Sequence, residues 1–392
     1  MTELEKLICD GNTLWEAFRA AQKSSAWKPQ VQAFEINLLD ELVRLQKELL
    51  ERTYKTSQKM EFMLNERGKV RLIRGAQIRD RVVRHALCDA VLNPILSRKL
   101  IYDNCASIKG KGIHMSRNRL KVHLHRYYRK HKTNEGYILL MDFSGFFDNL
   151  RHDLLIKSVE KHIKDDFVLW LLKLVIKDFE QDVSFLPDEE IDKLYHGKFK
   201  ALDYAKVPKK LKTGKKFLRK SVDIGDQCSQ ILGIYYPTPI DNYIKIVCGE
   251  KYYGRYMDDS YLISPSKERL IEILIHVKAM AKEMGLILND KKIKILPISK
   301  TFRYLQNKYF LTETGRVVER ANPKRISAMC RKLKKLAVKV QEGKLPLEDV
   351  VNTFQSWKGN YYRIMSKAQR KQMDEHFNEL FKKKGGRQNE TV

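Results

Sequence analysis

Residues 253–263 read Tyr-Gly-Arg-Tyr-Met-Asp-Asp-Ser-Tyr-Leu-Ile, and this stretch decides the fold. Strand-forming apolar and aromatic residues lie on both sides of two adjacent acids, Asp258 and Asp259. The pattern predicts a strand, a tight turn that carries both acids, and a second strand. Adjacent carboxylates repel each other unless a cation neutralises them, and a divalent metal ion is the usual cation. An exposed polar turn without a metal explains this segment by itself equally well.

A third acid follows an apolar run earlier in the chain. Residues 138–141 are Ile-Leu-Leu-Met, and Asp142 comes next. A continuous apolar run of this kind predicts a buried strand that delivers the Asp142 carboxylate at its C-terminal end. Taken alone, Asp142 is also explained as a strand-end or helix-capping residue. Taken together, the three acids predict a site for two Mg²⁺ ions, which would stabilise the attacking and leaving oxygens of a displacement reaction.

The two acidic segments resemble motifs of reverse transcriptases of the bacterial retroelement type. Residues 256–259 (Tyr-Met-Asp-Asp) resemble the Tyr-x-Asp-Asp box of that family, and residues 142–148 (Asp-Phe-Ser-Gly-Phe-Phe-Asp) resemble its first catalytic motif. Further similarity follows in family order from about residue 40 to about residue 365. The resemblance implies an RNA-directed DNA polymerase with the α+β right-hand fold: fingers, a palm of antiparallel sheet plus helices, and a helical thumb.

The resemblance and the helical patterns divide the chain into four parts. The expected parts are N-terminal helices and fingers in residues 1–135, a palm in 136–310 with an insertion at about 180–222, a helical thumb in 311–382 and a disordered tail in 383–392. The Lys-rich stretch 206–220 of the insertion is interpreted as a hairpin or loop that contacts nucleic acid, with a solvated loop as an equal alternative. Trp357, Tyr361 and Tyr362 are expected to pack within the thumb.

The resemblance also assigns roles to residues around the acids. It implies that Asp142, Asp258 and Asp259, with the main-chain carbonyl of Phe143, bind two Mg²⁺ ions, with Mn²⁺ as an alternative. Residues 286–294 resemble a family segment that has a lysine near the leaving pyrophosphate. Lys292 is the aligned candidate for a general acid, and a neighbouring lysine is the alternative.

A predicted β-hairpin over residues 61–75 carries basic residues on its second strand. In the family this hairpin brings cations to the triphosphate of the incoming nucleotide, which makes Arg71 the first candidate and Lys69 the second. A guanidinium suits phosphate oxygens because its donors form a planar fork. A solvated basic strand face is the alternative. Leu72 stands where related sequences usually have a proline.

Three further residues are assigned to the substrate by the resemblance. Phe147, five residues after Asp142, matches a bulky side chain that rejects the 2′-OH of a ribose, whereas core packing would explain a lone phenylalanine. Gly225 and Gln230 match a motif below the nascent base pair, where glycine lets the backbone approach the nucleotide closely. Ser229-Gln230 replaces the Ser-Pro of intron-encoded and retroviral relatives. This form is typical of diversity-generating retroelements and of some defence-associated relatives.

The composition agrees with a protein that binds nucleic acid. The 392 residues include 76 Lys+Arg against 48 Asp+Glu, and the net charge of +28 favours a polyanionic partner. No apolar run approaches the ~20 residues that span a bilayer, and residues 1–10 lack a signal-peptide pattern, so a cytoplasmic protein without membrane contact is expected. The six cysteines form no Cys-x-x-Cys pair, as expected of free thiols in a reducing compartment.

The expected partners are an RNA template, a DNA or RNA primer and deoxynucleoside triphosphates. A dedicated non-coding RNA and an accessory protein remain open. Residues 117–132 form a basic segment with Tyr127 and Tyr128, which suits backbone binding with base or sugar stacking, although a solvated helix face is the alternative. His123 and His125 in this segment are interpreted as facing phosphate or solvent, not zinc.

Two other functions remain open from the sequence. An RNA-binding scaffold of the same fold is disfavoured because the acids are intact. An intron maturase that acts by folding RNA is disfavoured only in its nuclease-bearing form, since no His/Asn-rich endonuclease pattern follows the thumb. The sequence does not decide between diversification and phage defence as the biological role.

Overall fold

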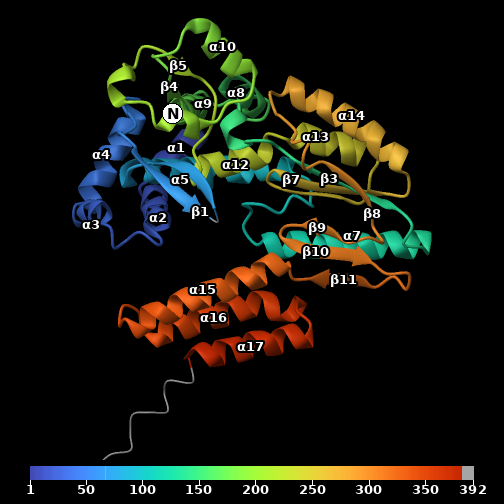
Figure 1. The fold of residues 1–392 in the computed structure, drawn as a ribbon. Helices are drawn as coiled ribbons and strands as arrows, with labels where there is room; N and C mark the ends of the chain where they lie inside the picture. Colours follow the sequence, from blue (N-terminus) through green and yellow to red (C-terminus); the bar gives the residue numbers. More distant parts are fainter. Residues whose placement is uncertain (67, 382–392) are drawn as a thin grey trace, which may run out of the picture. The chain divides into compact units, whose positions relative to one another are not determined.

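The computed structural model describes residues 1–66 and 68–381, which form helices and antiparallel sheets (Figure 1). This mixture confirms the predicted α+β class. The chain folds into two compact units: the first comprises residues 1–120 and 139–295, and the second comprises residues 121–138 and the chain from residue 296. The predicted disordered tail, residues 383–392, lies outside the described residues. No helix in the described ranges has the length and apolar character needed to cross a membrane.

The first unit begins with four helices whose apolar faces pack together. They are α1 (Glu3–Cys9), α2 (Gly11–Gln22), α3 (Pro29–Ile36) and α4 (Leu38–Leu50). In α4 the buried leucines stand at positions 38, 42, 45 and 49. Because this spacing of three or four residues places them on one stripe of a helix, it explains why the segment is helical and which face it buries.

The predicted hairpin follows, with β1 (Met60–Glu66) antiparallel to β2 (Lys69–Gly75). Gly68 has a positive φ of 78° at the turn, a conformation that glycine adopts without steric cost. Residues 78–99 form a series of helical segments. These are α5 (Ile78–Leu87), the π-helical turn η1 (Cys88–Leu92), α6 (Asn93–Leu96) and the short 3₁₀ turn η2 (Ser97–Lys99).

A four-stranded sheet has the strand order β6-β7-β3-β8. Its members are β3 (Tyr137–Asp142), β6 (Tyr253–Tyr256), β7 (Asp259–Ser264) and β8 (Lys294–Pro297). The helix α14 (Lys267–Glu283) packs against β7 and against α13 (Thr238–Asn242). The apolar run before Asp142 is largely buried in β3, as the sequence predicts.

Between β3 and β6 the chain forms helices and a compact insertion. The whole stretch between β3 and β6 contains, in chain order, η3 (Phe147–Asn149), α8 (His152–Glu160), α9 (Asp166–Lys177), β4 (Gln181–Asp182), α10 (Asp188–His196), α11 (Ala201–Ala205), η4 (Lys209–Leu211), β5 (Phe217–Leu218), α12 (Gln227–Tyr235) and, after α13, η5 (Tyr243–Val247). The insertion is more than the expected hairpin or loop. β4 and β5 pair to close it, and it has its own buried cluster, which includes Val183, Phe199 and Leu218.

The second unit contains a three-stranded sheet and three helices. They are β9 (Phe302–Tyr304), β10 (Asn307–Leu311), β11 (Val317–Arg320), α15 (Pro323–Gln341), α16 (Leu347–Tyr361) and α17 (Lys367–Phe381), with the 3₁₀ turn η6 (Tyr362–Ile364) before α17. Phe354 and Phe377 stack at 4.4 Å between ring centroids in the core of the three helices. Trp357, Tyr361 and Tyr362 pack against this core, which confirms the prediction that these three side chains pack within this part of the chain.

The expectation for the basic helix α7 (Ile113–His131) is wrong at two side chains, Tyr127 and His123. Tyr127 is fully buried, stacks on His131 and donates a 2.5 Å hydrogen bond to the carbonyl of Glu135. The hydroxyl of Tyr128 donates to the Glu313 carbonyl at 2.7 Å. His123 is only 1% exposed and does not face solvent. Because one face of α7 is buried, Tyr127 and His123 fill the protein interior, and Tyr127 is not displayed for stacking on bases, whereas Tyr128 is half-buried.

Candidate active site

The hairpin β6–β7 presents the adjacent acids as the sequence predicts. Tyr256 pairs with Asp259 at the end of the two strands, which leaves Met257 and Asp258 in the turn. Met257 has a φ of 55°, in the left-handed region. This conformation costs a non-glycine residue about 1–2 kcal/mol, so neighbouring contacts must hold the turn in place.

Arg255 supplies one of these contacts, and the sequence analysis missed it. Its side chain is 1% exposed and donates to the main-chain oxygen of Met257 at 3.0 Å. The guanidinium also pairs with Asp241 at 2.6 Å, and Asp241 accepts a hydrogen bond from the Tyr253 hydroxyl at 2.7 Å. A buried arginine requires such a partner, because an unpaired charge is costly inside a protein. An arginine within a strand-forming run next to two acids could have indicated this role.

Asp142 ends β3 and is paired with Lys292. The Nζ of Lys292 lies 2.7 Å from Oδ1 and 2.8 Å from Oδ2 of Asp142, whose side chain is 6% exposed. Main-chain hydrogen bonds place the lysine there. The Asn289 N–H donates to the Asp142 carbonyl at 2.8 Å, and the Lys292 N–H donates to the Asn289 carbonyl at 2.8 Å in the turn that follows.

The electrostatics show that Asp142, Asp258 and Lys292 lie close enough to interact. Burial and, next, the negative charge of Asp142 raise the pKa of Asp258, while Lys292 and Lys69 oppose the increase. Burial by itself lowers the pKa of Lys292, but its hydrogen bonds and attraction to Asp142, with smaller contributions from Asp258 and Asp259, raise that pKa overall. The structure therefore brings together the three acids and the lysine that the sequence analysis selected.

The acids fit a divalent cation by their chemistry, although no three His, Cys, Asp or Glu side chains among the described residues form a ready-made metal cluster. Carboxylate and carbonyl oxygens are ligands that Mg²⁺ prefers. Asp142 already pairs with the ammonium of Lys292, and burial together with the charge of Asp142 raises the pKa of Asp258, so a bound cation would stabilise both carboxylates. Phe143 pairs with Leu288 in an isolated antiparallel bridge. The hydrogen bonds of this bridge are made by the neighbours of Phe143, the Asp142 carbonyl and the Ser144 N–H, with the facing segment. The Phe143 carbonyl is thus not used in that bridge.

A pocket of about 190 Å³ lies in the first unit between β2, the insertion and the segment before α12. Its lining residues are Val70, Arg71, Leu72, Arg74, Asp148, Lys200, Ala201, Leu202, Ser221, Val222, Asp223 and Ile224. Arg71 is thus on the pocket wall, and its Nε is 3.8 Å from Glu66. Lys69 is not on this wall, but its charge acts on Asp258. Burial raises the pKa of Asp148 to about 6.

Phe147 lies next to this pocket and is fixed from two sides. Its carbonyl accepts a 3.0 Å hydrogen bond from the N–H of Val222. Its ring packs on Gly233 of α12, where an added Cβ would lie 2.7 Å from the Phe147 ring. Glycine at position 233 therefore leaves the space that the ring occupies.

Gly225 and Gln230 lie in the loop and the first turn that lead into α12. Gly225 is exposed. Its φ of 91° lies in the left-handed region, so the backbone there favours glycine. Gln230 is half-buried on α12. The Asp226 carboxylate caps the helix by accepting from the N–H groups of Cys228 at 2.9 Å and Ser229 at 3.3 Å.

The similarity of this chain to known proteins identifies its family. A model of the family described as reverse transcriptase (RNA-dependent DNA polymerase) matches residues 55–307, which include all the site residues above. The chain belongs to the reverse transcriptase family. No curated protein matches its sequence.

Among solved structures, the chain is similar to apo telomerase from Candida tropicalis, with a TM-score of 0.43 and 15% identity over 67% of this chain and 48% of that one. The same telomerase truncated from its C-terminal domain gives a TM-score of 0.43 and 13% identity over 67% of this chain and 55% of that one. The chain thus spans about half the length of these structures.

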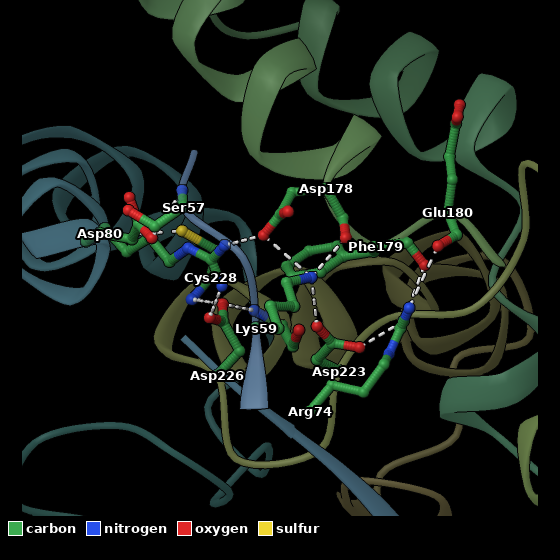
Figure 2. A network of polar contacts seen from close by, with 12 residues as sticks. Ser57, Lys59, Arg74, Asp80, Asp178, Phe179, Glu180, Asp223, Asp226 and Cys228 are labelled. Carbon is green, nitrogen blue, oxygen red and sulfur yellow. Dashed lines mark hydrogen bonds and ion pairs between the residues drawn. The ribbon is translucent and has the colours of Figure 1, made fainter. Parts of the chain in front are cut away.

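A buried ionic network lies beside the pocket, and the sequence analysis missed it as well (Figure 2). Three cations and three acids take part: Lys59, Arg74, Arg84, Asp178, Asp223 and Asp226. They come from the start of the hairpin, the end of β2, α5, the end of α9 and the segment before α12. The residues of each pair are far apart in sequence, as in the 164 residues that separate Lys59 from Asp223.

Proposed function

We propose that this reverse transcriptase is an active RNA-directed DNA polymerase, which copies an RNA template into cDNA by extending a DNA or RNA primer with deoxynucleoside triphosphates. The observation that carries the proposal is the convergence of Lys292 and Asp258 on Asp142. Acids from two strands and a basic residue from a third segment form the set that nucleotidyl transfer requires. The net charge of +28 supports nucleic acid as the partner.

In this proposal Asp142, Asp258 and Asp259, with the Phe143 carbonyl, bind two Mg²⁺ ions, and Mn²⁺ is an alternative. When bound, the metal ions lower the pKa of the primer 3′-OH and neutralise charge on the triphosphate. Lys292 holds its proton at neutral pH, as lysines ordinarily do, and its pairing with Asp142 raises its pKa further. It donates a proton to the leaving pyrophosphate as a general acid.

The pocket beside β2 is proposed to receive part of the incoming nucleotide. Arg71 on its wall and Lys69 near Asp258 bind phosphate oxygens. Phe147 excludes the 2′-OH of a ribose by contact with the sugar. Gly225 and Gln230 lie beneath the nascent base pair. The support is the position of Arg71 in a cavity whose other walls lie next to Phe147 and before Gly225.

For the biological role we propose a bacterial retroelement that serves sequence diversification or phage defence, on the basis of the Ser229-Gln230 pair. A dedicated non-coding RNA and an accessory protein belong to this proposal. Cytoplasmic location belongs to it too, and it is supported by six cysteines that are all free, including Cys88 and Cys228, whose sulfur atoms are 3.3 Å apart. The intact acids disfavour the alternative of an RNA-binding scaffold, whereas an intron maturase without nuclease activity stays an alternative.

The proposal is tested by sequencing the nucleic acid that copurifies with the wild-type protein and with Asp258→Asn, both expressed from the native locus. DNA complementary to a local RNA, present only with the wild type, supports the proposal and identifies the template. Adenine-directed errors in that DNA favour diversification, whereas a faithful or repetitive product favours defence. Bound RNA without DNA in either sample contradicts the proposal and favours the scaffold or maturase.

A further inference from the structure

We propose that Asp223 is a positioning residue that sets the geometry of the nucleotide pocket by tying β2 to the segment before α12. The inference rests on the proposed function of the pocket. It goes beyond that function because it assigns the ionic network a measurable effect on nucleotide affinity, separate from its effect on stability.

Asp223 contacts two cationic side chains, one just before β1 and one in β2. Its side chain is 2% exposed and accepts from Lys59 Nζ at 2.6 Å. Its other oxygen pairs with the guanidinium of Arg74. Arg74 also donates to the carbonyls of Phe179 at 2.7 Å and Glu180 at 3.1 Å, so its fork is fixed on two sides (Figure 2). The end of β2 is therefore held against the segment that contains Asp223.

The other ion pairs of the network also anchor the segment before α12. Lys59 also pairs with Asp178 at 2.9 Å. Arg84 pairs with both Asp178 and Asp226, and Asp226 caps α12. Because three cations meet three acids, the network is electrically balanced, and no member has a spare charge to offer a metal ion. Asp223 thus does not act as an additional metal ligand.

The same segment also touches the sugar side of the pocket. Val222, next to Asp223, donates its N–H to the carbonyl of Phe147 at 3.0 Å. Arg71, on the phosphate side, lies three residues before Arg74 in β2. Arg71, Arg74, Val222 and Asp223 all line the pocket. A change at Asp223 is therefore expected to shift Arg71 relative to Phe147 and to weaken binding of the triphosphate, which raises KM for the nucleotide.

The experiment compares Asp223→Asn with Asp178→Asn in steady-state incorporation of single deoxynucleotides on a primed RNA template. Asp178→Asn is the matched control, since it removes an equivalent charge from Lys59 in the same network but does not line the pocket. We expect Asp223→Asn to raise KM for the deoxynucleotide about 10-fold with kcat within about 3-fold. Asp178→Asn should lower the melting temperature comparably and change KM less than about 2-fold.

Arg74→Gln and the double variant Arg74→Gln/Asp223→Asn complete the test. Residues that act as a unit give similar losses singly and together, so all three variants should show about the same 10-fold rise in KM. Arg74→Lys retains the charge balance but loses the guanidinium fork, and it should raise KM even if Asp223→Asn fails to fold.

Each contrary result has its own meaning. Equal KM for Asp223→Asn and Asp178→Asn would show that Asp223 has a stabilising role only. A lower KM in Asp223→Asn would show that Arg74, once released, binds phosphate itself, and would also overturn the inference. If the wild type incorporates no deoxynucleotide, the proposed function fails, whereas normal wild-type incorporation leaves that function intact when the inference fails.

Discussion

The ammonium of Lys292 lies 2.7 Å and 2.8 Å from the two carboxylate oxygens of Asp142. One lysine thus neutralises the most buried acid of the site from a segment 150 residues further along the chain. The main-chain hydrogen bond from Asn289 to Asp142 sets this arrangement. Lys292 therefore stabilises this buried carboxylate, and in the proposed mechanism it also donates a proton to the leaving pyrophosphate.

Substitution of Lys292 separates these two roles. Lys292→Met should lower kcat about 100-fold, because general acids commonly contribute 10²–10⁴-fold, and should change KM for deoxynucleotides only about 2-fold. Single-turnover incorporation on a primed RNA template measures the effect. Lys291→Met is the control, since this exposed neighbour is the competing candidate. A larger loss in Lys291→Met than in Lys292→Met would contradict the assignment.

The raised pKa of Asp258 predicts how stability depends on charge at this site. Since the folded state raises that pKa above its unfolded value, protonation stabilises the fold, and this stability is lost as pH rises through the folded pKa. At pH 7 in a chelator, Asp258→Asn should therefore raise the melting temperature by about 1–3 °C. Mg²⁺ should stabilise the wild type more than the variant.

Asp290→Asn provides the matched control for the melting experiment. Asp290 is exposed and pairs with Lys278 at 2.7 Å on the surface. Its loss should move the melting temperature by less than about 1 °C, as is usual for exposed pairs. A lower melting temperature of Asp258→Asn than of the wild type in a chelator would refute the electrostatic description of the site.

Arg255 should be required for the turn that carries the acids. Arg255→Met leaves Asp241 buried without its partner and should destabilise the protein by about 3–5 kcal/mol. The double variant Arg255→Met/Asp241→Leu removes both charges and should regain most of the stability. Its polymerase activity should stay low, because the Met257 carbonyl still lacks its donor. Full activity in a stable double variant would show that the contact with Met257 is dispensable.

Gly233 should control the position of the Phe147 ring. An alanine Cβ would lie 2.7 Å from that ring, so Gly233→Ala must displace the ring or the helix. We expect kcat/KM for deoxynucleotides to fall about 10-fold. Adding Phe147→Ala should restore deoxynucleotide use and increase ribonucleotide incorporation. Gly359→Ala, a helical glycine with open space around it, is the control. No relief by Phe147→Ala would indicate that the helix, not the ring, has moved.

Sequence patterns sufficed where local periodicity determines the structure. The apolar run before Asp142 and the strands around Asp258 place their acids at strand ends, because a buried strand and a tight hairpin leave few other positions. Such patterns do not specify pairing between distant residues. Asp241 and Arg255 lie in different elements, and Lys59 reaches Asp223 across 164 residues, so their contacts depend on the complete fold.

The error in α7 and the unpredicted core of the insertion have a common physical origin. Tyr127 lies among basic residues, so composition suggested an exposed nucleic-acid surface, yet its position on the helix faces inward. In the insertion, lysines obscure a small apolar cluster that forms only when β4 and β5 pair. In both cases tertiary packing outweighs the average polarity of the segment.

The most direct test of polymerase function is primer extension by purified protein on an RNA template with Mg²⁺ and deoxynucleotides. Wild type, Asp258→Asn and the control Asp290→Asn are compared, with RNA binding measured in parallel. The structure predicts extension by the wild type and Asp290→Asn, and a loss of at least about 1,000-fold in Asp258→Asn with RNA affinity retained. Comparable extension by Asp258→Asn would contradict the assignment of the acids and with it the proposed mechanism.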